Sequence, residues 1–176
     1  LGGNNNSAIG WYSLYNNTNG SGNTAIGLSS LQSNTIGNSN TALGRQSLFL
    51  NTTGSNITAI GHSSLRSNLA NNNTAVGYES AYSNTTGAQI TAVGQAALRS
   101  NTLGSNNSAF GEGALYFNTL GNNNVSLGAY SLFRNISGSN NTSVGDTSLG
   151  FTTSNNNVAL GYLAGNSNTS GANNIF

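Results

Sequence analysis

Few side chains in this chain of 176 residues could support catalysis. There are three acidic residues, four basic residues, one histidine and no cysteine. Glu112 and Asp146 are separated by two periods of the repeat described below, which puts their carboxylates about 10 Å apart, the wide limit for a glycosidase pair. No insertion between the repeats provides a pocket around them. We therefore expect that the protein is not an enzyme.

A metal or cofactor site is also not expected. The side chains of the types that bind zinc or calcium are spread over four repeats; they are His62, Glu79, Glu112 and Asp146. A zinc site needs roughly three or four such ligands and calcium needs more oxygen atoms, so no first coordination shell can be assembled. These residues stand at variable positions of the repeat, which is typical of solvated surface charges.

The charged residues are carried by a short, regular repeat. The phrase Asn40-Thr41-Ala42-Leu43-Gly44 returns along the chain, and each copy ends on a glycine. The glycines are spaced by 17 residues, and in two places by 16. They are Gly10, Gly27, Gly44, Gly61, Gly77, Gly94, Gly111, Gly128, Gly145 and Gly161. This period predicts a solenoid with one coil per repeat, so we interpret residues 1–176 as one continuous array and a window of a longer repeat region.

Two apolar rows are expected to form the interior. We number each repeat from its phrase-ending glycine, position 0. Position −1 is apolar in every repeat and position +4 is nearly always leucine, so both are predicted to point inward. Position −2 is always alanine or serine, which predicts close approach by a neighbouring subunit or a tight wall. Two apolar side chains per coil make a thin core relative to the backbone that must be ordered, so we expect an oligomer.

The remaining recurrent positions are polar. Position +7 is nearly always asparagine, and stacked amides can hydrogen-bond along a column. The predicted asparagine ladder is Asn17, Asn34, Asn51, Asn68, Asn84, Asn101, Asn118, Asn135 and Asn168. Position +10 is usually glycine, which predicts a turn with positive φ. Asn71 and Asn155 replace this glycine in the two 16-residue repeats, so we expect the shortening to fall in this turn.

The residue types favour strands over helices. Scattered glycines and β-branched residues argue against a helix in each repeat. We predict an all-β fold, a parallel β-solenoid (β-roll) of about ten coils, each 16–17 residues long. Each coil would contain a strand from position −4 to about +1 and a second strand from +3 to +6. One parallel-strand spacing per coil, about 4.8 Å, gives a rod about 45–50 Å long.

One outward column has a distinctive composition. Since position +4 points inward, alternation turns position +5 outward. Six consecutive coils carry there Phe49, Arg66, Tyr82, Arg99, Tyr116 and Phe133. At one strand spacing, each guanidinium would lie between two rings, as cation–π stacking requires. This stacking stripe is either a stabilising ladder or subunit contact, or a surface that recognises a glycan or a protein partner.

Composition limits the partners. The net charge is +1, with 4% charged residues, whereas nucleic-acid binding needs a basic footprint and membrane-surface binding needs a polybasic segment. No apolar run reaches the roughly 18 residues of a membrane helix. We expect no nucleic acid and no membrane insertion in this segment. The expected partners are further copies of the chain, as a trimer or an end-to-end filament, and glycans or a host surface receptor.

The phrases Asn73-Thr74-Ala75-Val76-Gly77 and Asn6-Ser7-Ala8-Ile9-Gly10 resemble the YadA-like head repeats of trimeric autotransporter adhesins. The longer unit, Thr91-Ala92-Val93-Gly94 through Asn101-Thr102-Leu103-Gly104, is similar to repeats of predicted bacterial surface proteins and tail-fibre-like phage proteins. The resemblance covers all ten repeats and implies a left-handed, trimeric β-roll displayed outside a cell or on a virion. We therefore expect a structural segment of an extracellular or virion-surface fibre, acting as spacer and adhesive surface. A phage tail-fibre receptor-binding shaft is one alternative.

An ice-binding β-solenoid is the other alternative. Position −3 is mostly threonine, as in Thr24 and Thr58, but Val125 and Val158 interrupt the row. A second threonine row is missing because position −1 is apolar. The fibre hypothesis is therefore favoured.

Overall fold

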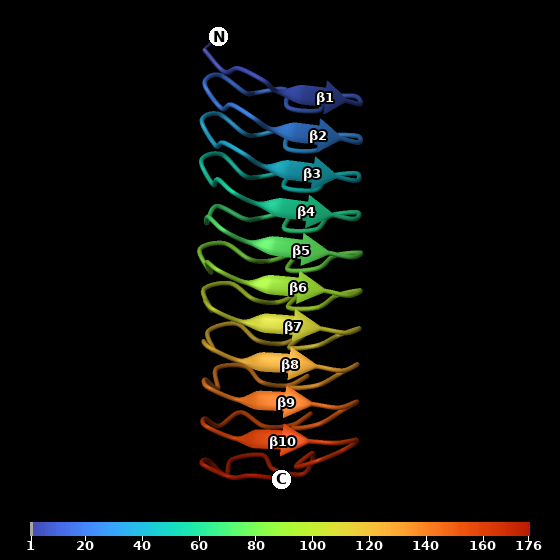
Figure 1. The fold of residues 1–176 in the computed structure, drawn as a ribbon, viewed down its shortest axis with the longest axis vertical. Coiled ribbons are helices and arrows are strands. Elements are labelled where there is room, and N and C mark those ends of the chain that lie inside the picture. Colours follow the sequence, from blue (N-terminus) through green and yellow to red (C-terminus); the bar gives the residue numbers. More distant parts are fainter. Residues whose placement is uncertain (1) are drawn as a thin grey trace.

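A single sheet of ten parallel strands forms the framework of the protein. The computed structural model describes residues 2–176, and neighbouring strands pair in sequence order with identical repeat positions in register (Figure 1). The strands are β1 (Ser7–Ile9), β2 (Thr24–Ile26), β3 (Thr41–Leu43), β4 (Thr58–Ile60), β5 (Thr74–Val76), β6 (Thr91–Val93), β7 (Ser108–Phe110), β8 (Val125–Leu127), β9 (Thr142–Val144) and β10 (Val158–Leu160).

Each strand ends where the phrase-ending glycine leaves the extended conformation. Gly111, for example, has φ of 133°, and a Cβ added to it would lie 2.5 Å from the carbonyl oxygen of Gly128 in the next coil. Only glycine tolerates both conditions. In Figure 1 the strands run left to right on the near face and the chain returns behind them to the next level, which is a left-handed winding. The predicted all-β parallel solenoid of about 17 residues per coil is confirmed.

The predicted inward orientation of position −1 is wrong, whereas position −2 packs against the interior of its own coil, which is the tight wall that its small residues predicted and not a neighbouring subunit. The middle residue of strands β2 to β10, at position −2, is buried, as at Ala92 and Ser126, which are fully inaccessible. Position −1 faces outward, and Leu127 and Leu160 are 49% and 73% exposed. Alternation along a three-residue strand leaves only its centre inside. The interior is narrow because the leucine at +4 fills it, so only alanine or serine fits at −2. The inward prediction for position +4 is confirmed.

The predicted second strand at +3 to +6 is replaced by turns. Residues at +2 and +4 have positive φ, including leucines such as Leu98 (52°) and Leu115 (53°). Their amides still bond the neighbouring coils: the Leu98 N–H donates to the Ala114 carbonyl at 2.9 Å. A non-glycine residue in this region costs about 1–2 kcal/mol, and regular bonding between coils holds it there.

The glycine at +10 is required for close approach and does not adopt the predicted positive φ. A Cβ on Gly104 would lie 2.3 Å from the carbonyl oxygen of Gly121. In the two shortened coils Ala70 and Ser154 occupy this place, since their carbonyl oxygens face Gly54 and Gly138. The missing residue therefore lies between positions +7 and +10, within the predicted turn. Asn71 and Asn155 belong to a later column and are not substitutes for the glycine.

Candidate functional site

The asparagine ladder at +7 forms a buried column of amide–amide hydrogen bonds. Asn84 donates to Asn68 at 2.7 Å, and Asn101 donates to Asn84 at 2.7 Å. Each amide nitrogen also donates to a turn carbonyl, as Asn101 does to Gly104 at 2.8 Å. The column is interrupted where each shortened coil begins, because the buried side-chain oxygens of Asn51 and Asn135, in the preceding coils, have no hydrogen-bond partner. The ladder is confirmed as a structural element in two runs, from Asn17 to Asn51 and from Asn68 to Asn135, whereas the Asn168 side chain bonds only to Gly171 and does not join it.

A second asparagine column, at position −4, was not predicted. The side-chain oxygen of Asn107 accepts the backbone N–H of Asn124 at 2.9 Å, and the Asn107 amide donates to the Gly121 carbonyl at 2.7 Å. That carbonyl also accepts from Asn118 of the first ladder, at 3.0 Å. Asparagine opens most copies of the repeated phrase, so the signal was present in the sequence. The two columns are joined at the turn carbonyls, which fixes the corner of each coil.

The structure places the six residues of the stacking stripe next to one another, half-buried along one side of the rod. The guanidinium carbon of Arg66 lies 5.0 Å from the ring centroid of Phe49 and 5.7 Å from that of Tyr82. Arg99 lies 5.4 Å from Tyr82 and 5.7 Å from Tyr116. The Tyr116 and Phe133 ring centroids are 5.4 Å apart. Each arginine therefore contacts two rings.

One ion pair anchors the stripe. The Nε of Arg99 donates to the Oε2 of Glu79 at 2.7 Å, and both side chains are mostly buried, with 34% and 18% of their surfaces exposed. Burial opposes ionisation of Glu79, but hydrogen bonds from Arg99 and Tyr78 outweigh it and hold the pKa of Glu79 below its ordinary value. The hydrogen bond to Glu79 raises the pKa of the Arg99 guanidinium. Glu79 is therefore a structural carboxylate in its charged form at neutral pH.

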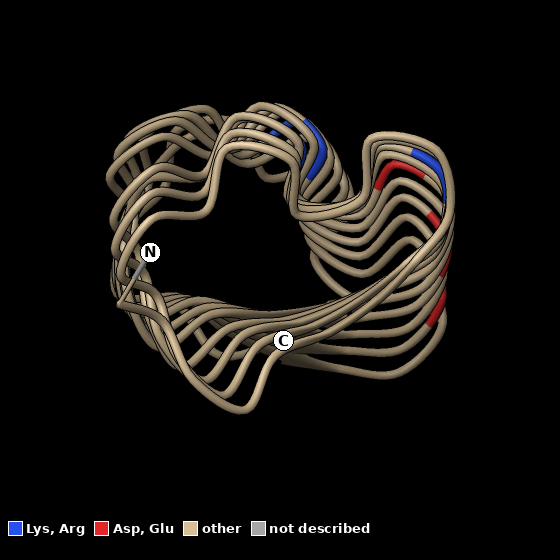
Figure 2. Cartoon of the chain, turned by 90° about the horizontal axis from the view of Figure 1, so that it is seen from above, with Lys and Arg blue, Asp and Glu red and all other residues tan. Residues whose placement is uncertain are grey.

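The other candidate chemical residues do not converge. The Tyr130 hydroxyl donates to the Glu112 carboxylate at 2.6 Å, which raises the pKa of Tyr130. Asp146 accepts from the Thr147 hydroxyl at 2.5 Å, and the His62 ring stacks on Tyr78 with centroids 5.4 Å apart. Seen along the rod, the charged residues fall on one side of the coil (Figure 2). Within residues 2–176 no group of three histidine, aspartate or glutamate side chains could hold a metal ion.

Beside the end of the stripe lies an aromatic groove that was not predicted. Its volume is about 290 Å³, and it is lined by Gln95, Glu112, Tyr116, Phe117, Tyr130 and Phe133. Phe133 is the centre of this cluster, with ring centroids 5.1 Å from Phe117 and 5.5 Å from Tyr130. Phe117 also lines an adjoining hollow of about 200 Å³ with Arg134 and Ile136. The sequence signal was a repeat with adjacent aromatic residues at +5 and +6 and glycine at +2.

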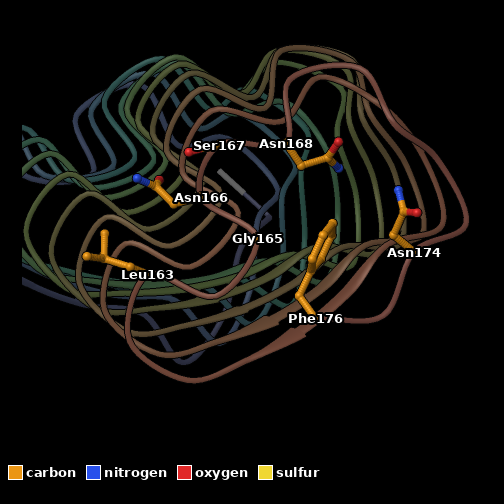
Figure 3. A pocket seen from close by; sticks show the side chains of 7 residues that line it. All are labelled: Leu163, Gly165, Asn166, Ser167, Asn168, Asn174 and Phe176. Atoms are coloured by element: carbon orange, nitrogen blue, oxygen red, sulfur yellow. The ribbon is translucent and has the colours of Figure 1, made fainter.

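A larger hollow of about 450 Å³ lies at the last described coil (Figure 3). Gly165 stands at +4, where other coils carry leucine, and a Cβ on it would lie 2.5 Å from the Phe176 ring. Phe176 thus approaches the space below Leu149. The hollow lies within this coil, and its polar lining consists of Asn166, Ser167, Asn168 and Asn174.

Comparison of the chain with protein-family models, with curated proteins and with solved structures finds no match. Across residues 2–176, no helix is long and apolar enough to cross a membrane.

Proposed function

We propose that this chain is a rigid structural segment of an extracellular or virion-surface fibre, acting as spacer and adhesive surface. The observation that carries the proposal is the repetition of the same bonding in consecutive coils. Each coil is joined to the next by a strand pair, and most are also joined by the buried asparagine columns. Such a stack has no hinge and repeats the same outward columns along about 48 Å, one strand spacing per coil.

The rod itself is tested by solution measurements on the chain of 176 residues. Circular dichroism should show β structure without helix, and small-angle scattering and electron microscopy should show a particle elongated along one axis. A helical or disordered spectrum would overturn the proposal. So would a compact, nearly spherical particle.

We propose that copies associate side by side, as a trimer, through the outward face of the sheet. The small residues at −2 are buried within the coil, so they are not the contact face. The row at −1 is apolar in all ten coils and outward, as at Val76 and Val93. A strip about 48 Å by 10 Å on each partner buries roughly 1,000 Å² in total, near the lower limit for a specific interface.

Sedimentation tests this assembly. We expect the parent chain to sediment as an oligomer and the double variant Val76→Lys with Val93→Lys to sediment as a folded monomer. Thr86→Lys, which adds a charge at an exposed corner position, is the control and should remain oligomeric. A monomeric parent would refute the association while leaving the rod intact.

Ice binding is a second candidate, favoured by one observation. Because position −1 faces outward, the sheet presents two parallel rows, mostly threonine at −3 and mostly aliphatic residues at −1, as at Thr58 and Ile60. Regular threonine and aliphatic side chains on a flat sheet suit an ordered water layer. Measurement of thermal hysteresis tests ice binding. Ice binding is supported if the parent depresses the freezing point and the double variant Thr58→Lys with Thr74→Lys does not. It is refuted if the parent shows no hysteresis.

A further inference from the structure

We infer that the aromatic groove around Phe117 is a binding site for one or two rings of a neutral oligosaccharide. This inference specifies the ligand of the adhesive surface and rests on the function proposed above. The groove spans the three coils that begin after Gly94, Gly111 and Gly128.

The shape of the groove depends on Gly113. This residue has φ of 60°, and a Cβ on it would lie 2.8 Å from the ring of Tyr130. Among the ten coils it is the only glycine at position +2. Tyr130 therefore lies over the backbone of the preceding coil, where a side chain stands in other repeats. The groove therefore forms because Gly113 has no side chain and because Phe117 is aromatic at position +6.

The aromatic rings are exposed and mutually fixed. Phe117 and Tyr130 are 41% and 40% exposed, although both contact Phe133 edge-on. Edge-to-face packing holds the rings at steep angles, so their faces and edges form the walls of the groove. A pyranose presents C–H bonds on one face and hydroxyls around its edge. Rigid, exposed aromatic walls suit the C–H face, because little side-chain entropy is lost on binding.

Polar groups at the rim suit the hydroxyls. Glu112 supplies a carboxylate that accepts hydrogen bonds, and its contact with the Tyr130 hydroxyl at 2.6 Å fixes both groups at the wall. Gln95 supplies an amide that both donates and accepts. The carboxylate disfavours an anionic ligand at this position. The groove volume of about 290 Å³ is small for a ligand site, which limits the occupant to one ring, with a second ring in the hollow beyond Phe117.

The repeat itself supplies variants that preserve the fold. Serine stands at +6 in Ser67, Ser83 and Ser100, so Phe117→Ser restores a residue that other coils already accept. Serine also stands at +2 in Ser63, with φ of 56°, so Gly113→Ser places in the groove a residue that another coil accepts in the same backbone conformation, and its Cβ displaces the Tyr130 ring. Tyr162→Ser is the control, because it removes an equally large exposed aromatic side chain elsewhere.

Isothermal titration calorimetry of the full chain with cellotetraose, N-acetylchitotetraose, mannotetraose and 3′-sialyllactose tests the inference. We expect at least one neutral tetrasaccharide to bind, sialyllactose to bind more weakly, and Phe117→Ser and Gly113→Ser each to lower the affinity at least about tenfold. Tyr162→Ser should bind like the parent. No binding of any neutral sugar at about 10 mM, preference for sialyllactose, or equal loss in the control would each overturn it. Circular dichroism of the same samples reports on the rod separately, so failure of sugar binding is distinguishable from failure of the proposed function.

Discussion

Asn101 donates a hydrogen bond from its side-chain amide to the side-chain oxygen of Asn84, one coil earlier, at 2.7 Å. The same amide donates to the Gly104 carbonyl, and the Asn101 oxygen accepts from Asn118. Asn101 is fully buried, so all three bonds form away from water. The stack of coils therefore depends on buried amide and carbonyl groups that can bond only to one another.

Asn101→Ala should therefore destabilise the chain strongly. The change removes the three bonds and leaves the Asn84 oxygen and the Gly104 carbonyl buried without partners, at about 1–3 kcal/mol each. Chemical denaturation should show a loss of roughly 3–5 kcal/mol. Asn16→Ala, at an exposed corner position, is the control and should stay within about 0.5 kcal/mol of the parent. Equal stability of the two variants would mean that the ladder contributes nothing to the fold.

The stacking stripe predicts a smaller effect at Arg66. Arg66→Gln replaces the arginine by the residue that Gln32 provides at the same position, and it removes contacts with Phe49 and Tyr82. At about 0.5–1 kcal/mol per cation–π contact, the expected loss is about 1–2 kcal/mol. Arg45→Gln removes an exposed arginine and should change stability little. The stacking has no energetic role if thermal unfolding of both variants matches the parent.

Acid should weaken the fold through Glu79. Its pKa is lowered in the folded chain, so its stabilising contribution is complete above the unfolded value of about 4.3 and is lost as pH falls through the lower folded value. We expect Glu79→Gln to be less stable than the parent at pH 7 and to lose less stability between pH 5 and pH 2. Thr86→Ala, which changes an exposed side chain without altering any charge, should retain the acid dependence of the parent. An unchanged dependence in Glu79→Gln would contradict the assignment.

Repeat spacing predicted most of the architecture because identical residues at a fixed period must occupy identical places in a stack. Hydrophobicity did not predict which side of the strand is inside. The aliphatic residue at −1 is the more apolar, yet Ala92 is buried because the leucine at +4 leaves room for a methyl group only. The positive φ of Leu98 could not be inferred, because leucine rarely adopts it without bonds from neighbouring coils. The aromatic groove forms because Gly113 has no side chain. A glycine carries no reactive group, so the groove could not be predicted from the chemistry of the side chains.

The last prediction compares two adjacent residues of β6, Ala92 at position −2, which is buried, and Val93 at position −1, which faces outward. Ala92 is completely buried at the centre of β6, and no coil has a residue larger than alanine or serine at this position. The neighbouring coils are held about 4.8 Å away on both sides by strand pairing, so the backbone cannot move apart to admit a larger side chain. Ala92→Leu should therefore cost at least the roughly 1–3 kcal/mol of an overpacked core, with local loss of pairing around β6.

Val93→Leu provides the matched comparison, since it adds one methylene group to the next residue, which faces outward. Leucine already stands at this position in Leu43, Leu127 and Leu160, so the variant should fold with nearly unchanged stability. Ala92→Ser, which copies Ser126, should also be tolerated. Hydrogen exchange of the amides in β5 to β7 measures the difference: protection should fall in Ala92→Leu alone. If Val93→Leu lost protection and Ala92→Leu kept it, position −1 would be the inward one and the orientation of the strands would have to be reversed.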